Sequence, residues 1–161
     1  LRAAALYGHV AMVKLLVGAG ADVNLGCRNS IGPLYAAVSG WTAELLMLRH
    51  NARAAEEAPT PTWHPPLPFI ALRPYVDTIK SLVELGADVN ATSHPGGDSA
   101  LHCACFLGNL EAARLLIALG ADVNRKDDRG DTPLHAALQC NINVRMMELL
   151  IDSGASVTEE N

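Results

Sequence analysis

Two short groups of residues in this sequence have side chains that could do chemistry. The segment His102–Cys105 supplies an imidazole and two thiols, which are the ligand types that zinc prefers. The segment Asp127–Asp131 reads DDRGD; its carboxylates could hold calcium, and it contains the Arg-Gly-Asp tripeptide of integrin ligands. Each group also has a purely structural interpretation, and the elements around it decide between the two.

The cysteines lack the spacing of a metal site. Cys103 and Cys105 alternate with alanine in an apolar segment, whereas Cys27 and Cys140 lie far away in the chain, and no two cysteines form a CxxC pair. Cysteine behaves as a small hydrophobic residue, so we expect Cys103 and Cys105 to be buried between helices. Thiols without a disulfide pattern fit a reducing compartment, which predicts a cytoplasmic or nuclear location. No metal site is predicted.

The other motifs give no sign of catalysis. Asp127–Asp131 lacks the alternating oxygen ligands and closing glutamate of a calcium-binding EF-hand, so we interpret it as a turn. Catalysis by His102 or His135 would require a nucleophile and an orienting carboxylate beside the ring. No such set emerges, and neither does a phosphate-binding glycine loop or a catalytic carboxylate pair. We therefore predict no enzymatic activity, no catalytic residue, no cofactor and no small-molecule substrate.

Composition argues against two classes of partner. The net charge is −5 with both signs mixed along the chain, so no basic stripe can neutralise the phosphates of a nucleic acid. No apolar run approaches the roughly 18 residues of a membrane-spanning helix. Hydrophobic residues make up 50% of the chain but aromatic residues only 4%, which fits thin layers of Ala, Leu and Val between closely stacked helices. Nucleic acid and membrane are not predicted partners.

A repeated pentapeptide sets the architecture of the chain. The sequence GADVN begins at Gly20, Gly86 and Gly120, and a weaker copy begins at Gly154. Successive glycines are 66, 34 and 34 residues apart, and because 66 is twice 33, one intervening copy has decayed while its length was kept. A period near 33 residues predicts a solenoid in which each unit packs only on its neighbours.

The repeats divide the chain into units of one domain, residues 1–161. We expect a truncated repeat, a degenerate repeat, a degenerate repeat with a proline-rich finger, two nearly intact repeats and the start of a further finger. Their boundaries are 1–24, 25–53, 54–90, 91–124, 125–157 and 158–161. Because both ends fall inside a unit, we expect the chain to be a fragment of a longer array.

Within the units, apolar residues recur at the spacing of one helix face. Second helices are predicted over Val10–Val17 and Val76–Leu85, the latter beginning after Pro74. In the last unit the apolar stripe is assigned to Met147, Leu149, Leu150 and Ile151.

The TPLHAA motif at Thr132–Ala137, the four G-A-x-V stretches and the period together resemble the ankyrin repeat family. The resemblance covers the whole chain. It implies an all-α repeat solenoid of L-shaped helix-turn-helix units linked by β-hairpin-like fingers. It also implies that Ser99 and Thr132, with His102 and His135, tie each helix start to adjacent backbone.

The resemblance also implies a function. We expect a protein–protein interaction module, or scaffold, that binds a protein partner through its finger tips and the concave face of its first helices. The alternative is the substrate-recognition part of a larger enzyme complex, such as a ubiquitin ligase receptor. On the family template, with Trp63 added from the proline-rich finger, the predicted protein-binding residues are Leu6, Tyr7, Asn29, Ile31, Ser39, Trp63, Asp98, Phe106, Leu107, Arg129, Asp131 and Gln139.

Three asparagines stand in a further pattern. Asn24, Asn90 and Asn124 each follow Asp-Val, and each has a leucine eight residues earlier in the sequence. That arrangement resembles the sites modified by the asparaginyl hydroxylase that acts on ankyrin repeats, so hydroxylation of these residues is possible on the family pattern. The alternative is that the three side chains make turn hydrogen bonds.

Overall fold

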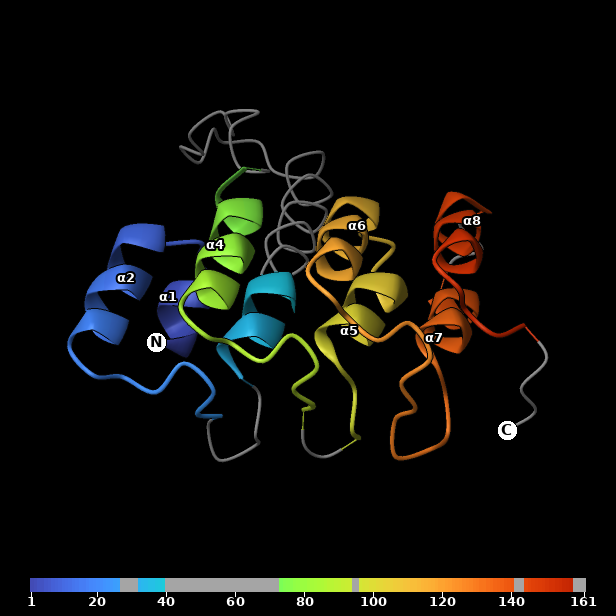
Figure 1. The fold of residues 1–161 in the computed structure, drawn as a ribbon, viewed down its shortest axis with the longest axis horizontal. Coiled ribbons are helices and arrows are strands. Elements are labelled where there is room, and N and C mark those ends of the chain that lie inside the picture. The colour runs from blue at the N-terminus through green and yellow to red at the C-terminus, as the bar shows by residue number, and fades with distance from the viewer. Residues whose placement is uncertain (27–31, 40–72, 94–95, 141–143, 158–161) are drawn as a thin grey trace, which may run out of the picture.

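The computed structural model describes residues 1–26, 32–39, 73–93, 96–140 and 144–157, and the helices in these ranges form two rows. The outer row contains α2, α4, α6 and α8, and the inner row contains α1, residues 33–39, α5 and α7 (Figure 1). Their bounds are α1 Arg2–Leu6, α2 Val10–Gly18, α4 Arg73–Glu84, α5 Ala100–Phe106, α6 Leu110–Ala118, α7 Pro133–Cys140 and α8 Val144–Asp152.

Helices pack in pairs within a unit and also along each row. Contacts join α1 to α2, α5 to α6 and α7 to α8, while α2 packs on α4, α5 on α7, and α6 on both α4 and α8. Among the described residues the only bridge between extended segments is antiparallel, between Thr92 and Ser99. The predicted all-α repeat solenoid is therefore confirmed. No helix in the described ranges is long and apolar enough to cross a membrane.

The fourth unit shows why these residues form a helix pair. Ser99 caps the N-terminus of α5 by accepting from the backbone N–H of His102. Gly108 adopts a φ of 67°, a left-handed conformation that glycine reaches without strain, and so turns the chain sharply. Asn109 then caps α6 through its side chain, which accepts from the N–H of Ala112. The two helices are thus started and stopped by local side chains.

Small and branched aliphatic side chains fill the space between the rows. Ala104 and Ala113 are fully buried, which lets the helix backbones approach closely. Cys103 and Cys105 are buried free thiols, as the sequence predicts for small residues at a helix interface. Large side chains complete the core, and they are Val13, Ile79, Leu82, Leu101, Leu116, Met146 and Leu150.

Three sequence expectations need correction. The 66 residues from Gly20 to Gly86 do not form two stacked units, because α2 packs directly on α4 and Asn24 bonds to Gly86 and Asp88 as Asn90 bonds to Gly120 and Asp122. Helix α4 begins at Arg73 rather than after Pro74; proline is tolerated there because the first turn of a helix does not use its N–H groups. In α8 the buried stripe is centred on Met146 and Leu150, one helical turn apart, and Ile151 is exposed. Met147 and Leu149 lie half-buried beside the stripe, so the assigned face was rotated by about one residue.

Candidate functional site

A groove of about 340 Å³ lies along the inner row of helices. Residues 33–39, α5 and α7 contribute its walls, and the fingers that precede α5 and α7 contribute one rim. The groove brings together six residues that the sequence analysis proposed for protein binding, namely Ser39, Asp98, Phe106, Leu107, Arg129 and Gln139. These positions come from three neighbouring helical segments of the inner row, so the groove is a property of the stacked array rather than of one repeat.

The lining also contains residues that sequence reasoning missed, namely Tyr35, His102, Cys103 and Ala136. Helical spacing could have found three of them, because residues three or four apart share a helix face. Tyr35 precedes Ser39 by four residues, Cys103 precedes Phe106 by three, and Ala136 precedes Gln139 by three.

The remaining predicted residues are distributed more widely. Asp131 borders the groove and accepts a hydrogen bond of 3.0 Å from Gln139 Nε2 to its Oδ2. Leu6 is half-buried and Tyr7 exposed at the end of α1, outside the lining of the groove. Asn29, Ile31 and Trp63 lie outside the described residues.

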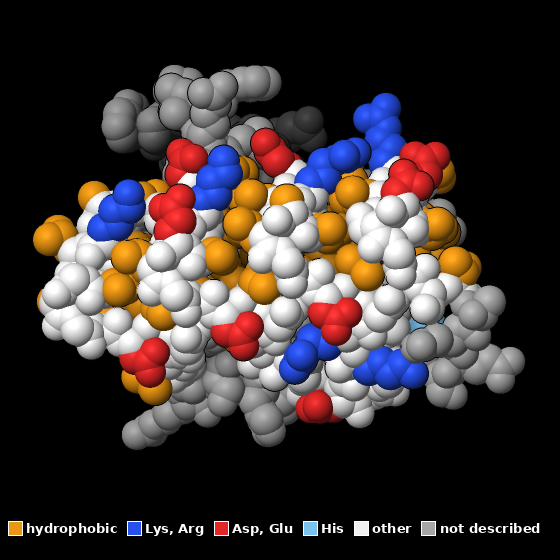
Figure 2. Space-filling model, in the orientation of Figure 1, with side chains coloured by type: hydrophobic (Ala, Val, Ile, Leu, Met, Phe, Trp, Pro, Cys, Tyr) orange, Lys and Arg blue, Asp and Glu red, His pale blue; other side chains and the backbone are white. Residues whose placement is uncertain are grey.

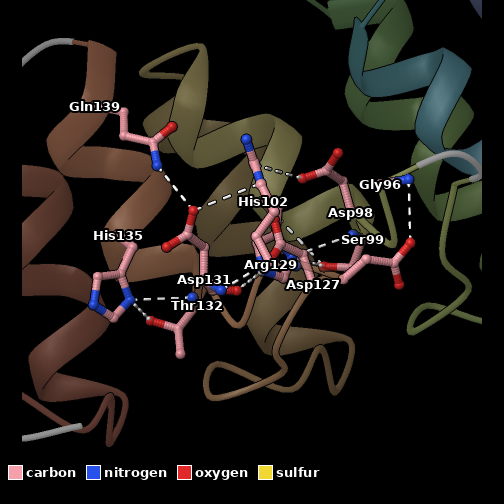
Figure 3. A network of polar contacts seen from close by, with 11 residues as sticks. Gly96, Asp98, Ser99, His102, Asp127, Arg129, Asp131, Thr132, His135 and Gln139 are labelled. Atoms are coloured by element: carbon pink, nitrogen blue, oxygen red, sulfur yellow. Dashed lines mark hydrogen bonds and ion pairs between the residues drawn. The ribbon is translucent and has the colours of Figure 1, made fainter. Parts of the chain in front are cut away.

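A carboxylate at the centre of the fifth unit's finger organises the rim. Asp127 Oδ1 accepts from the backbone N–H groups of Arg129 and Asp131, at 2.8 and 2.9 Å. Its Oδ2 accepts from Arg129 Nε and Nη2, at 3.0 and 2.9 Å (Figure 3). The side chain of Asp127 has 0% exposed surface. Burial raises its pKa, but the hydrogen bonds from Arg129 and Asp131 outweigh burial and hold the pKa below its ordinary value.

Arg129 is therefore an internal partner as well as a surface residue. Its Nη2 lies 3.8 Å from Asp98 Oδ1, and its Nε lies 3.7 Å from Asp131 Oδ2. The side chain is 62% exposed, so one edge of the guanidinium faces solvent at the groove rim. Among the described residues, the guanidinium of Arg129 donates its hydrogen bonds to Asp127, so this predicted binding residue is already engaged within its own finger.

His102 links the fourth unit to the next finger. The backbone N–H of Ser99 donates to His102 Nδ1 at 3.1 Å, so Nε2 carries the proton and donates to the carbonyl of Asp131 at 3.0 Å. His135 repeats the first half of this arrangement, with its Nδ1 accepting from the N–H of Thr132 at 3.1 Å. The predicted structural role of both histidines is confirmed, and their rings are oriented for hydrogen bonding within the fold (Figure 3).

The Cys103 thiol lines the groove but is not in its reactive, deprotonated form. Burial is the main factor that raises its pKa, to about 12, so the sulfur stays protonated near neutral pH. A hydrogen bond joins the side chains of Cys103 and Tyr35, and burial also raises the pKa of the Tyr35 phenol. The floor of the groove is thus uncharged and partly aromatic.

The three asparagines tie successive fingers together. Asn90 Nδ2 donates to the carbonyl of Gly120 at 3.3 Å, and its Oδ1 accepts from the N–H of Asp122 at 2.8 Å. Asn24 makes the same pair of bonds to Gly86 and Asp88, at 3.1 and 2.8 Å. Asn124 continues the series with its amide 3.0 Å from Gly154 O and its Oδ1 2.8 Å from Ser156 N. The asparagine side chains thus bond to the backbone of a neighbouring finger rather than within their own turn, and hydroxylation stays a prediction.

We expect Asn90→Ala to lower the free energy of unfolding by about 1–3 kcal/mol, since two hydrogen bonds between fingers are lost at about 0.5–1.5 kcal/mol each. Urea denaturation measures the change. Glu84→Ala, at an exposed position of α4, is the control that should alter stability little. Equal stability of the two variants would show that the asparagine bonds do not contribute to the free energy of unfolding.

The fold and the groove define a helical repeat scaffold, and comparison with known proteins identifies its family. The family model "Ankyrin repeats (3 copies)" matches residues 67–161, and the model "Ankyrin repeat" matches residues 1–28. This chain belongs to the ankyrin repeat family. Ankyrin repeats are protein-interaction modules.

The matches to curated relatives cover only part of each relative. Bovine (Bos taurus) NF-kappa-B inhibitor zeta is 33% identical over 162 residues, covering 94% of this chain and 21% of the relative. Human ankyrin repeat and SOCS box protein 16 is 36% identical over 94 residues, covering 57% of this chain and 20% of the relative. Human protein phosphatase 1 regulatory subunit 27 is 53% identical over 47 residues, covering 29% of this chain and 30% of the relative. This chain therefore spans less than a third of each of these relatives.

Proposed function

We propose that this array is a non-enzymatic scaffold that binds a protein segment in the groove of its inner helices. The observation that carries the proposal is the groove itself, whose floor is apolar and whose rim carries the charged finger residues. Relatives named as an inhibitor and as a regulatory subunit support a binding role. The buried thiols Cys103 and Cys105 favour a reducing setting in the cytoplasm or nucleus.

Phe106 is the strongest candidate for an anchor. The six residues before it in α5 are all buried, whereas Phe106 is 46% exposed at the last position of the helix. Leu107, the next residue, is half-buried and packs against the core instead. A half-exposed aromatic side chain beside a groove becomes buried only when a partner covers it. Such side chains are typical of interface hot spots.

The test is made with peptides selected from a random display library against the folded chain. We expect Phe106→Ala to weaken binding of the selected peptides by about 1–4 kcal/mol. The melting temperature should change little, because the ring is substantially exposed in the free protein. Isothermal titration calorimetry measures the affinity, and circular dichroism measures the melting temperature.

Glu111→Ala and Arg114→Ala are matched controls, since both side chains are exposed on α6 in the outer row. On the face shown in Figure 2, charged side chains gather over the outer helices and again on the finger loops, with hydrophobic side chains between them. If the controls weakened binding and Phe106→Ala did not, the partner would dock outside the groove.

A second candidate function is substrate recognition within a larger enzyme complex, such as a ubiquitin ligase receptor. The similarity to ankyrin repeat and SOCS box protein 16 favours it, because the name of that protein combines ankyrin repeats with a second element, the SOCS box. The full-length gene sequence tests it. A cullin-binding box or a kinase signature after Asn161 would favour this candidate, whereas further repeats or a stop codon would favour a free-standing scaffold.

A further inference from the structure

The carboxylate of Asp98 is the least compensated charge that lines the groove. It projects from the finger before α5, with its side chain 30% exposed. Its ion-pair partner in the described structure is Arg129, whose nearest nitrogen is 3.8 Å away, beyond hydrogen-bonding distance. Arg129 gives its short hydrogen bonds to Asp127 instead. Within the described part of the chain the Asp98 carboxylate accepts no hydrogen bond, so a donor that enters the groove can pair with it.

Charge around Asp98 favours a cation. Asp127 and Asp131 contribute two further carboxylates from the next finger, with Arg129 between them (Figure 3). Asp128 contributes a third carboxylate. Burial is the main factor that raises the pKa of Asp98, and the carboxylates of Asp127 and Asp128 raise it further, whereas His102 and, to a smaller extent, Arg129 oppose this rise. A positively charged side chain beside Asp98 would relieve this repulsion.

The side chains that line the groove favour a guanidinium over an ammonium group as the cation. Phe106 and Tyr35 present aromatic rings to the groove, and the Cys103 thiol between them in the lining is uncharged. A guanidinium is planar and weakly hydrated, stacks on aromatic faces and matches a carboxylate with two parallel N–H donors. An ammonium group is compact and strongly hydrated, so it loses more on entering such a groove.

We propose that the groove receives an arginine side chain of the partner, with the guanidinium bound to the Asp98 carboxylate and covered by Phe106 and Tyr35. This proposal rests on the proposed function, since it names the chemistry of the segment that the groove binds. The occupant is a peptide segment of another protein that carries an arginine among apolar residues.

The experiment begins with peptides selected from the random display library against the wild-type chain, which should be enriched in arginine. One such peptide is then synthesised with its key arginine, with lysine, and with citrulline, which is the uncharged analogue of arginine. Each peptide is titrated against the wild-type chain and against Asp98→Asn. Glu111→Gln removes one negative charge from the outer face and controls for general electrostatics.

On the wild-type chain and on Glu111→Gln, the citrulline peptide should bind about tenfold to a hundredfold more weakly than the arginine peptide, as expected for loss of one charge-assisted pair. On Asp98→Asn the two peptides should bind alike. The lysine peptide should fall between them on the wild-type chain. Asp98→Asn should be at least as stable as the wild-type chain at neutral pH, so its loss of binding cannot come from unfolding.

Three outcomes would overturn the proposal. The selected peptides could lack arginine, the citrulline penalty could be the same on Asp98→Asn, or lysine could bind as tightly as arginine. The variant Phe106→Ala separates a failure of the arginine contact from a failure of the proposed function. If the peptides lose affinity with Phe106→Ala but not with Asp98→Asn, the groove binds a partner without an arginine contact at Asp98. If neither substitution matters, the proposed function fails as well.

Discussion

His102→Leu is expected to lower the free energy of unfolding by about 2–4 kcal/mol, because buried polar groups would lose their partners. Leucine roughly fills the space of the imidazole, so cavity formation contributes little. The backbone N–H of Ser99, however, loses its acceptor at 3.1 Å, and the carbonyl of Asp131 loses the Nε2 donor at 3.0 Å. Since His102 is 1% exposed, water cannot replace these bonds. Urea denaturation followed by circular dichroism measures the loss.

His135→Leu is the matched control for that experiment. The ring occupies the same position in the next unit, is half-buried, and makes its described hydrogen bonds to Thr132 at its own helix start. We expect a smaller destabilisation, since no bond to a following finger is lost among the described residues. Equal effects of the two substitutions would contradict a role for His102 in joining α5 to the finger of the next unit.

Asp127→Ala is expected to lower the free energy of unfolding at neutral pH by about 2–4 kcal/mol, because hydrogen bonds to a charged acceptor are each worth about 1.5–3 kcal/mol. Two backbone N–H groups and the Arg129 guanidinium would lose their acceptor. The pKa of Asp127 is lowered in the fold. Its stabilisation is therefore present above the ordinary value of 3.8 and is lost as pH falls through the lower folded value.

The difference in stability between Asp127→Ala and the wild-type chain should accordingly shrink when unfolding is measured at increasingly acidic pH. Asp127→Asn separates the contacts to the backbone from the contact to the Arg129 guanidinium. The amide oxygen can still accept from the backbone N–H groups of Arg129 and Asp131, but the amide nitrogen faces the guanidinium. It should lie between the wild-type chain and Asp127→Ala. A difference that stayed constant with pH would rule out the ionised carboxylate as its source.

The repeat period predicted the fold because each unit uses the same local devices. Gly108 and Asn109 stop one helix and start the next through backbone conformation and a side-chain cap, and both are visible in the sequence. The pairing of Ser99 with His102 was also predicted, since it follows from a motif of neighbouring residues. Helix caps and turns that are set by a few neighbouring residues could therefore be predicted from the sequence alone.

Features that depend on two units were harder to predict. The template gave Arg129 a position near the concave face, but not its approach to Asp98, which lies 31 residues earlier in the sequence. Met146 was missed because the sequence pattern assigned the apolar face of α8 to residues 147–151, about one residue out of register with the buried face. Tyr35 was missed because it meets the residues of α5 only in the groove, where residues 33–39 and α5 come together.

The most direct test of binding in the groove is methyl NMR on the chain labelled at alanine methyl groups and titrated with a selected peptide. Ala136 lines the groove, and Ala118 is exposed at the end of α6 in the outer row. A peptide bound in the groove should shift the Ala136 methyl signal strongly and leave that of Ala118 unchanged. A strong shift at Ala118 with none at Ala136 would contradict binding in the groove.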